Sequence, residues 1–430
     1  MYEERSQNMS VIEVTDRIPT EGSYDVIVAG GGVSGAAAAV AARRMGSRVL
    51  LIEKSISLGG LATIGLINLF VPMCNGRGVQ IIKGMAEEFL RLSIRYGYDT
   101  IPKEWRDGEP GEGATSRYVT RFSPAIFSLA LTELMKEEQV DILYDTVVSA
   151  PVMEGGHCKG LIVENKSGRQ YYEGKIIIDT TGDGDILYRA GVPVVQGGNY
   201  FTMTSLGADL NSCQAALKAG DIEKVLRTYA GGNATLYGER HPENMPQFEG
   251  TNVGSVTDFI VKNHLATLER IKEDNRKERD IIMLPAMAQL RTTRTLIGDA
   301  VFSKDSAYEH CETSIGAICD FDRRDYLYEV PYGALVKTGY DNLMTAGRTA
   351  SAKPDYSWDV LRVIPPAIIT GQAAGTAAAL AVTSGRAVYD IDVAVLQAEL
   401  ERQNVMIHFD DSLIPADREA SGERVDIGHM

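Results

Sequence analysis

The sequence predicts an α/β fold in which a parallel sheet with an attached β-meander carries an inserted α+β region. Three observations predict it. Residues 24–54 alternate a short apolar run, a glycine-rich turn, an alanine-rich run and a second apolar run. Residues 142–185 hold three β-rich runs divided by Gly155–Gly156 and by residues 166–168. Residues 330–382 add an apolar strand and a long helix of small residues, as expected for a sheet covered by helices.

A glycine-rich turn follows the first apolar run, Tyr24–Ala29, and precedes a helix expected over Ala36–Arg44. The first glycine of such a turn permits the tight bend, the second lets the backbone approach a pyrophosphate, and the third lets helix and strand pack closely. The helix N-terminus adds unpaired N–H groups and the positive end of its dipole. The turn residues at this G-x-G-x-x-G spacing are Gly30, Gly32, Val33, Ser34 and Gly35.

The second apolar run, RVLLIE, ends on Glu53. Because Glu53 lies 21 residues after Gly32, its carboxylate is in place to accept hydrogen bonds from a ribose diol. The sequence therefore predicts a Rossmann-like domain that binds an adenine dinucleotide. The alternative, a loop whose glycines serve packing alone, leaves Glu53 without a role.

The segment KSISLGGLATIG, residues 54–65, favours FAD over NAD. It places a glycine pair and a threonine directly after the ribose-binding strand, where an NAD dehydrogenase normally continues into a crossover helix. The segment resembles the G-G-x-x-T-x-G stretch by which glutathione-reductase-like flavoproteins pass along FAD towards the isoalloxazine. That resemblance implies FAD contacts at Lys54, Gly59, Gly60, Leu61, Ala62, Thr63 and Gly65.

The β-meander ends in an apolar strand that runs into DTTGDGD, residues 179–185. In FAD domains this arrangement completes the sheet and returns the chain across the cofactor. The resemblance implies that Thr181, Gly182 and Asp183 lie at the cofactor and that the backbone of Val147 contacts the adenine.

The long helix of small residues carries Pro365 and Pro366 in its first turn, where no N–H bond is needed. We expect its N-terminus to aim the helix dipole at the N1–C2=O edge of the flavin and to stabilise the anionic reduced form. A turn at Gly347–Arg348 precedes the helix, and Arg348 is expected to contact phosphate or ribityl oxygens. The alternative for Arg348 is an ion pair between packed elements. Contacts to FAD are expected at Gly347, Arg348, Pro366, Ala367 and Ile368.

Seven motifs together resemble the FAD-dependent oxidoreductase family of the two-dinucleotide-binding-domain flavoproteins: GGGVSG, GGLATIG, DTTGDGD, RTTRTLIGD, VPYGALV, DNLMTAGR and LRVIPPAIITGQAAGTAAALA. The match runs from about Tyr24 to Val382. The resemblance implies non-covalently bound FAD and a redox reaction. Many family members carry cysteine where this chain has Ala62, Thr349 and Ala367, so the resemblance does not extend to a thiol–disulfide mechanism.

Composition and charge limit the partners. The formal net charge is −15 and the basic residues are scattered, so nucleic acid is not expected. The N-terminus lacks the apolar core of a signal peptide, and residues 365–382 suit a buried helix better than a membrane span. The five cysteines form no C-x-x-C pair and no cluster at metal-ligand spacing. We therefore expect a cytoplasmic protein with a small-molecule substrate and no metal. Both a monomer and a homo-oligomer are compatible with the sequence.

The FAD-binding domain is expected to be discontinuous and to use residues 24–75, 119–190 and 326–385. Residues 76–118 and 191–325 are expected to form the inserted α+β substrate cap, with an N-terminal segment at 1–23 and a C-terminal tail at 386–430. Within the cap, the polar, Gly/Pro-rich stretches 98–118 and 230–255 are typical of lid loops.

The segment PAMAQLRTTRTLIGDAVFS, residues 285–303, supplies candidate catalytic residues. As a strand it places Arg291 and Arg294 on opposite faces, whereas as a helix it places them on one face. We expect one of the two, Arg291 before Arg294, to meet the substrate or the flavin. The alternative is that both pair with carboxylates.

The sequence predicts an FAD-dependent dehydrogenase or oxidase that transfers hydride between a small polar organic substrate and flavin N5, with the base and the electron acceptor unassigned. A flavin monooxygenase and a non-catalytic FAD-binding subunit are the alternatives. Single histidines such as His264 and His310 are expected at surface or satisfied core positions. Asp320 and Asp322 are expected in a solvated charge cluster with the arginines that follow them.

Overall fold

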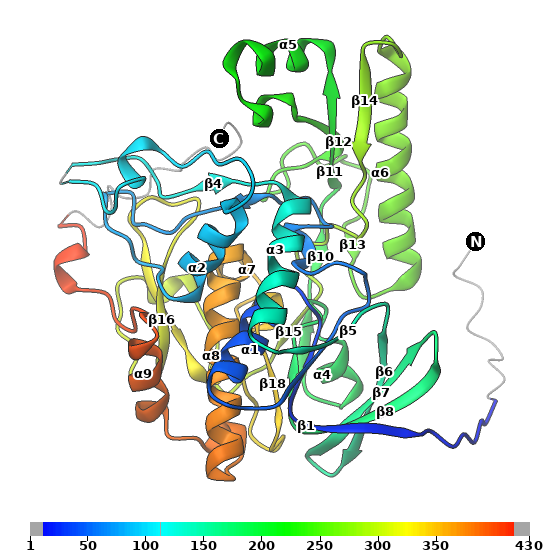
Figure 1. Ribbon diagram of the computed structural model, residues 1–430, viewed down its shortest axis with the longest axis vertical. Helices are drawn as coiled ribbons and strands as arrows, with labels where there is room; N and C mark the ends of the chain where they lie inside the picture. The colour runs from blue at the N-terminus through cyan, green and yellow to red at the C-terminus, as the bar shows by residue number, and fades with distance from the viewer. Residues whose placement is uncertain (1–11, 112, 417–430) are drawn as a thin grey trace.

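The structure is a computed structural model that describes residues 12–111 and 113–416 (Figure 1). A seven-stranded sheet lies at its centre, in the order β5-β2-β1-β8-β7-β6, with β18 also paired to β8. Its strands are β1 (Thr20–Ala29), β2 (Val49–Ile52), β5 (Asp141–Leu143), β6 (Val147–Glu154), β7 (His157–Asn165), β8 (Gly168–Asp179) and β18 (Leu343–Thr345).

The sheet combines a parallel part with a meander. β5, β2, β1, β8 and β18 run parallel, while β7 and β6 are antiparallel. β8 belongs to both parts, because its residues 168–173 pair with β7 and its residues 177–179 pair with β18. The predicted α/β class, with a parallel sheet and a β-meander, is confirmed. β1 begins at Thr20, inside the segment expected to precede the domain.

Two helices of small residues pack closely against this sheet. α1 (Val33–Arg44) is buried along its alanines, and α8 (Ile364–Ser384) carries Pro365 and Pro366 in its first turn, as predicted. α8 is long and apolar enough to cross a membrane, but 78% of its apolar window is buried inside the fold. It is the central core helix of this protein.

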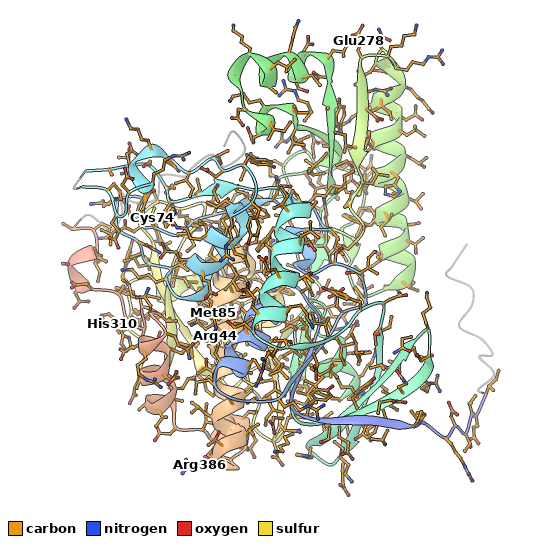
Figure 2. All side chains as sticks on the ribbon, in the orientation of Figure 1. Arg44, Cys74, Met85, Glu278, His310 and Arg386 are labelled. Atoms are coloured by element: carbon orange, nitrogen blue, oxygen red, sulfur yellow. The ribbon has the colours of Figure 1, made fainter. Side chains whose placement is uncertain are left out.

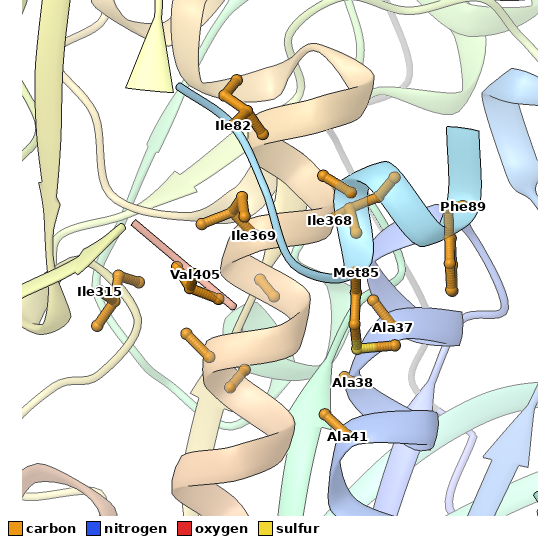
Figure 3. Packing of buried hydrophobic residues seen from close by; sticks show 14 of the residues in the cluster. Ala37, Ala38, Ala41, Ile82, Met85, Phe89, Ile315, Ile368, Ile369 and Val405 are labelled. Atoms are coloured by element: carbon orange, nitrogen blue, oxygen red, sulfur yellow. The ribbon is translucent and has the colours of Figure 1, made fainter. Parts of the chain in front are cut away.

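α2 (Met85–Ile94) and α3 (Pro124–Glu137) extend the same core. Figure 3 shows Met85 of α2 directed towards Ala37, Ala38 and Ala41 of α1. The Arg44 guanidinium, near Met85 in Figure 2, holds the carboxylates of Glu88 and Glu138 at 2.7 Å each. Residues 76–118, expected in the cap, thus contribute a helix to the main core, because the apolar face of α2 is buried.

The hairpin of β16 (Ser314–Cys319) and β17 (Leu327–Pro331) also packs on α8, as does α9 (Val393–Arg402). After α9 the chain returns across the hairpin and buries Val405, Ile407 and Phe409. The described part of the expected C-terminal tail is therefore built into the core. Residues 417–430, like residues 1–11, lie outside the described part of the chain.

Most of the rest of the inserted region forms an α+β arm at the top of Figure 1. Its antiparallel sheet has the order β12-β11-β14. The arm contains β11 (Thr202–Asp209), α5 (Leu210–Ala219), β12 (Arg227–Asn233), α6 (Val253–Glu273) and β14 (Arg279–Met283). The division into an FAD domain and a substrate cap at the expected boundaries stays a prediction.

Three further two-stranded sheets and two short helices belong to the described part of the chain as well. β9 pairs with β15, β10 with β13, and β3 with β4, each pair antiparallel. The strands are β3 (Leu69–Phe70), β4 (Thr120–Arg121), β9 (Val194–Gln196), β10 (Gly198–Asn199), β13 (Phe248–Glu249) and β15 (Arg294–Leu296). The helices are α4 (Asp185–Arg189) and α7 (Tyr356–Arg362).

Candidate functional site

A cavity lies beyond the carboxyl ends of β1, β2 and β8 and reaches the N-termini of α1 and α8. It encloses about 1100 Å³ of empty space, part of which is open to solvent. Crevices at this edge of a parallel sheet are the usual place for ligands in α/β proteins. The residues on its wall that the sequence assigned to the cofactor are Gly30, Gly32, Val33, Ser34, Glu53, Lys54, Gly59, Gly60, Leu61, Ala62, Val147, Thr181, Gly182, Arg348 and Ala367.

The glycine turn has the geometry that its spacing predicts. Gly30 has φ +111°, and a Cβ there would lie 2.4 Å from the carbonyl oxygen of Thr180. A Cβ on Gly35 would lie 1.9 Å from the carbonyl oxygen of Gly30, so only glycine lets α1 pack this closely on β1. Gly32 is the N-cap of α1, lies on the cavity wall, and has open space where a Cβ would project. The helix N-terminus is thus open to an anion.

Glu53 is buried at the end of β2 and lies on the cavity wall. One carboxylate oxygen accepts the Gly31 N–H at 2.6 Å, and the other accepts the Ser55 N–H at 2.7 Å. Each oxygen keeps a second lone pair for a ligand hydroxyl. Glu53 therefore orders the glycine turn and can also accept a ribose hydroxyl.

Thr63 and Gly65 lie behind the cavity wall. The Thr63 hydroxyl donates to the carbonyl oxygen of Leu58 at 2.6 Å, which ties the GGLATIG loop to its own start. The carbonyl oxygen of Gly65 accepts from the side-chain amide of Gln289 at 2.7 Å. Both residues shape the loop whose other members line the cavity.

The DTTGDGD turn is organised by Asp179, which is fully buried at the end of β8. Its carboxylate accepts backbone N–H groups of Thr181, Ile186 and Leu187 at 2.9–3.0 Å and also the Thr181 hydroxyl. Burial raises the pKa of Asp179 to about 6, although these donors act in the opposite direction. The position of Thr181 and Gly182 on the wall thus depends on a buried acid that does not reach the cavity.

Arg348 has its guanidinium nitrogens bonded to protein. Nε donates to the carbonyl oxygen of Gly182 at 2.6 Å, Nη1 to that of Leu290 at 2.5 Å, and Nη2 to the carboxylate of Asp183 at 2.8 Å. Asp183 also lies 3.9 Å from Lys54 Nζ. Arg348 borders the cavity, and the ion pair between packed elements, the alternative reading of the sequence, is present.

At the start of α8, Ala367 lies on the cavity wall and its neighbours face elsewhere. Pro366 and Ile368 are buried in the helix, and Gly347 donates its N–H to the Thr370 hydroxyl at 2.9 Å. The first turn of α8 therefore borders the cavity through one side of the helix.

The segment 285–303 contains only a three-residue strand, β15, instead of the expected long strand or helix. β15 pairs with the three residues of β9, and just before it the N–H groups of Arg291 and Thr292 donate to the Asn199 side chain instead of to a strand. The two arginines do point apart. Arg291 donates to the carbonyl oxygens of Thr235 at 2.9 Å and Ala234 at 3.4 Å, and Arg294 pairs with Asp185 at 2.9 Å.

Neither arginine borders the cavity directly. The Arg291 guanidinium is buried without a carboxylate partner among the described residues, and burial, followed by repulsion from Arg362, lowers its pKa to about 10. Arg294 lies over the ring of Tyr188 at 4.3 Å. Arg291 thus lies near Arg362 but off the cavity wall, whereas Arg294 connects β15 to α4.

Arg362 is a cavity residue that sequence reasoning missed. It ends α7, two residues before α8 begins, and pairs with Asp359 at 2.5 Å. A basic residue beside the proline-initiated helix was the available signal. Other cavity residues that were not assigned are Ile52, Ile64, Thr146, Val148, Thr180, Asp185, Met287 and Ile364.

The expected solvated cluster around Asp320 and Asp322 is wrong, since both aspartates are buried. Asp320 accepts the hydroxyls of Tyr328 at 3.0 Å and Tyr356 at 2.5 Å, and Asp322 accepts that of Tyr237. Burial raises the pKa of Asp320. These aspartates hold α7, β17 and the residue 237 loop together and do not border the cavity.

A Rossmann-like sheet, a glycine turn at a helix N-terminus and an acid at the end of the second strand define a dinucleotide-dependent oxidoreductase. The chain belongs to the FAD-dependent oxidoreductase family, whose model matches residues 25–252 and 295–400. The open space at Gly32 and the lone pairs of Glu53 fit the diphosphate and ribose of FAD.

Curated relatives carry the name tRNA uridine 5-carboxymethylaminomethyl modification enzyme MnmG. The protein from Geotalea uraniireducens is 27% identical over 60% of this chain and 40% of its own length. The one from Geobacter sulfurreducens is 30% identical over 53% of this chain and 35% of its own length. The chain thus spans less than half of the length of these relatives.

Two solved structures resemble this chain in part. A geranylgeranyl bacteriochlorophyll reductase-like protein from Thermoplasma acidophilum has a TM-score of 0.49 and 14% identity, covering 89% of this chain and 84% of its own. The p-nitrophenol 4-monooxygenase PnpA from Pseudomonas putida has a TM-score of 0.48 and 13% identity, covering 94% and 93%.

Proposed function

We propose that this protein is an FAD-dependent dehydrogenase or oxidase that takes hydride from a small organic anion. The observation that carries the proposal is the position of Arg362, on the cavity wall together with Ala367 at the start of α8. FAD, when bound, supplies the hydride acceptor. The protein binds the cofactor, orients the substrate and limits the access of water.

Three parts of the cavity wall would bind three different parts of FAD. The N–H groups at the start of α1, beside Gly32, face the cavity and suit the diphosphate. Glu53 would accept from the adenosine ribose, and Val147, exposed on the cavity wall, would border the adenine. The first turn of α8 also lies on the wall and would direct the positive end of its dipole at the flavin.

A substrate anion is favoured by the charges beside that end. Arg362 and Arg291 are close enough for the first to lower the pKa of the second, and the Asp359 carboxylate pairs with Arg362. Two guanidinium groups and one carboxylate leave one net positive charge in a largely buried place. A carboxylate or phosphate binds a guanidinium through two parallel hydrogen bonds, so a substrate of this kind suits the site.

The test starts with the purified protein, from which the cofactor is released by heat and identified. Small hydroxy and amino carboxylates and their neutral amides are then screened for anaerobic bleaching of the flavin. We expect the carboxylates to reduce it and the amides to fail. Bleaching by amides and acids alike would remove the anion from the proposal.

Two variants locate the anion. Arg362→Gln should keep its FAD and raise KM at least tenfold, because it loses one charged contact. Arg386→Gln, at an exposed arginine beyond α8, is the matched control and should behave as wild type. Arg291→Ala should also keep its flavin and lose turnover. Unchanged kinetics in both the Arg362 and the Arg291 variant would contradict the assignment.

The two alternative roles, a flavin monooxygenase and a non-catalytic FAD-binding subunit, give different results in the same assays. NAD(P)H consumption coupled to hydroxylation of the substrate would indicate a monooxygenase. A flavin that only dithionite reduces would indicate a subunit that carries FAD without turnover.

We infer that tRNA, which appears in the names of the curated relatives, is not a ligand of this chain. The inference is supported by the net charge of −15, since binding of a phosphate backbone depends on lysine and arginine. Fluorescence anisotropy with labelled bulk tRNA at low salt tests it, and salt-sensitive binding would overturn it. Cytoplasmic location stays part of the proposal, supported by five free cysteines, three of them buried.

A further inference from the structure

Three residues far apart in the sequence meet beside the C-terminal segment. Glu329 lies on β17, His310 lies in the loop before β16, and His408 follows α9. Figure 2 places His310 at the side of the molecule that carries α9. The ligand atoms of the three side chains lie within 4.8 Å of one another, and none of the three borders the cofactor cavity.

Both imidazoles direct Nδ1 at the Glu329 carboxylate. His310 Nδ1 lies 2.7 Å from one oxygen, and His408 Nδ1 lies 2.9 Å from the other. The rings are held in place, since His310 stacks on Phe409 with centroids 4.7 Å apart and the His310 and His408 rings cross at 86°. The two nitrogens and the carboxylate therefore converge on one point.

The Glu329 carboxylate has no arginine or lysine as an ion-pair partner within residues 12–111 and 113–416, although its side chain is 0% exposed. Its other partners are the backbone N–H groups of Cys311 at 2.6 Å and Phe409 at 3.3 Å. A buried carboxylate is costly without a charged partner, so the imidazole side of Glu329 is where a cation belongs.

The second nitrogen of His310 strengthens this conclusion. Its Nε2 lies 2.9 Å from the Asp411 carboxylate. An imidazolium would donate to both carboxylates, but a neutral imidazole carries one N–H and can donate to only one of them. If that N–H faces Asp411, the Nδ1 lone pair faces Glu329, and a cation between them satisfies both groups. Metal-bound histidines usually donate their other N–H to a carboxylate in this way.

We infer that Glu329, His310 and His408 form a binding site for a divalent cation of the zinc type, oriented by Asp411. Two imidazoles and one carboxylate are a common ligand set for Zn²⁺, with water in the fourth position. At metal–ligand distances of about 2.0–2.1 Å the three ligand atoms would lie about 3.3 Å apart. The two Nδ1 atoms lie 2.7 and 2.9 Å from the two carboxylate oxygens, and the ligand atoms all lie within 4.8 Å of one another, so no separation needs to change by more than about 1.5 Å. Small rotations of the half-exposed imidazoles can supply this change.

Such an ion would join three separate stretches of chain. The C-terminal segment already bonds to β16, where the Ala317 N–H donates to Met406 at 2.7 Å and the Ser314 hydroxyl donates to Ile407 at 2.7 Å. The ion would add a further connection between this segment, β17 and the loop before β16. Because the cavity shares no residue with the site, the ion would act on stability and leave FAD binding unchanged.

The experiment uses the full flavin-containing protein, treated with EDTA and dialysed into metal-free buffer. Equilibrium dialysis with Zn²⁺ and elemental analysis then gives the stoichiometry, and thermal unfolding is followed with and without Zn²⁺. We expect one Zn²⁺ per chain, a higher melting temperature with Zn²⁺, and no binding of Mg²⁺ at the same site. Flavin content should stay constant throughout.

Variants assign the ligands. His310→Ala and His408→Ala should each weaken Zn²⁺ binding at least tenfold and abolish the thermal shift, and Asp411→Asn should weaken binding about tenfold. His264→Ala, at an exposed histidine on α6, is the matched control. Both ligand imidazoles are half exposed, so their removal opens no cavity in the core. Absence of Zn²⁺ binding to the wild type, or undiminished binding to either ligand histidine variant, would overturn the inference.

Discussion

The contact between α8 and α1 allows a test that links packing to cofactor binding. A Cβ added at Gly371 would lie 2.2 Å from the carbonyl oxygen of Ser34, and one at Gly375 would lie 2.1 Å from that of Ala38. Ordinary contacts begin at 3.4 Å, so Gly371→Ala must move the helices apart by about 1.2 Å, the difference between 3.4 and 2.2 Å. The clashing atom belongs to the backbone, so a change of side-chain rotamer cannot relieve the clash.

Gly371→Ala and Gly375→Ala should destabilise the protein equally, but they should change its affinity for FAD to different extents. Overpacking costs about 1–3 kcal/mol, here at the upper end, and alanine gains about 1 kcal/mol over glycine inside a helix. We therefore expect a loss of about 2 kcal/mol in the free energy of unfolding for each variant. Ser34 lies on the cavity wall and Ala38 does not, so FAD affinity should fall more in Gly371→Ala.

Denaturant unfolding measures the first effect and fluorescence titration of the apoprotein with FAD measures the second. Gly111→Ala is the control, since a Cβ at Gly111 meets nothing within 4 Å. A Gly371→Ala variant as stable as the wild type would refute the close-packing reasoning. Equal FAD affinities in the Gly371→Ala and Gly375→Ala variants would refute the idea that displacing Ser34 weakens FAD binding.

Three further predictions concern buried groups. Glu53→Gln should lower the free energy of unfolding by about 1–3 kcal/mol and weaken FAD binding, because the NH₂ group of the glutamine must face a backbone N–H. Unchanged FAD affinity would contradict this prediction. Asp179→Asn should lose a similar amount for the same reason, measured by denaturant unfolding, without direct contact with FAD. In the native protein, Ellman's reagent should reach at most Cys213 and Cys311. Raising the pH from about 7 to about 9 should not add Cys158, because burial raises its pKa to about 11 and the reactive thiolate does not form. A third reactive thiol in the folded protein would contradict the last prediction.

Features set by neighbouring residues were predictable from the sequence. The strand, glycine turn, helix and second strand of residues 24–54 follow from local spacing, and the prolines at the start of α8 fix where that helix begins. Glu53 could be placed at the cavity because the end of a strand beside the glycine turn is a fixed position in this architecture.

Features set by distant partners were not predictable. The alternating pattern of residues 285–303 favours a long strand, but β9 offers only three residues to pair with. Arg348 was assigned to the cofactor because it lies in the right turn, and its bonds to Gly182 and Leu290 depend on how three segments meet. Glu329, His310 and His408 show no ligand spacing in the sequence, because β17, the loop before β16 and the C-terminal segment meet only in the fold.

Two buried acids explain how a chain with a net charge of −15 can hold an anionic cofactor. Glu53 and Asp179 end β2 and β8, the two neighbours of β1, and the backbone N–H groups beside them satisfy their oxygens. Their charges are thus balanced within the protein and they fix the turns on both sides of Gly30. The field in the cavity comes instead from the N-termini of α1 and α8, with Lys54 and Arg362 on the wall. We therefore expect the charges and helix N-termini at the cavity, and not the overall charge, to decide what the cavity binds.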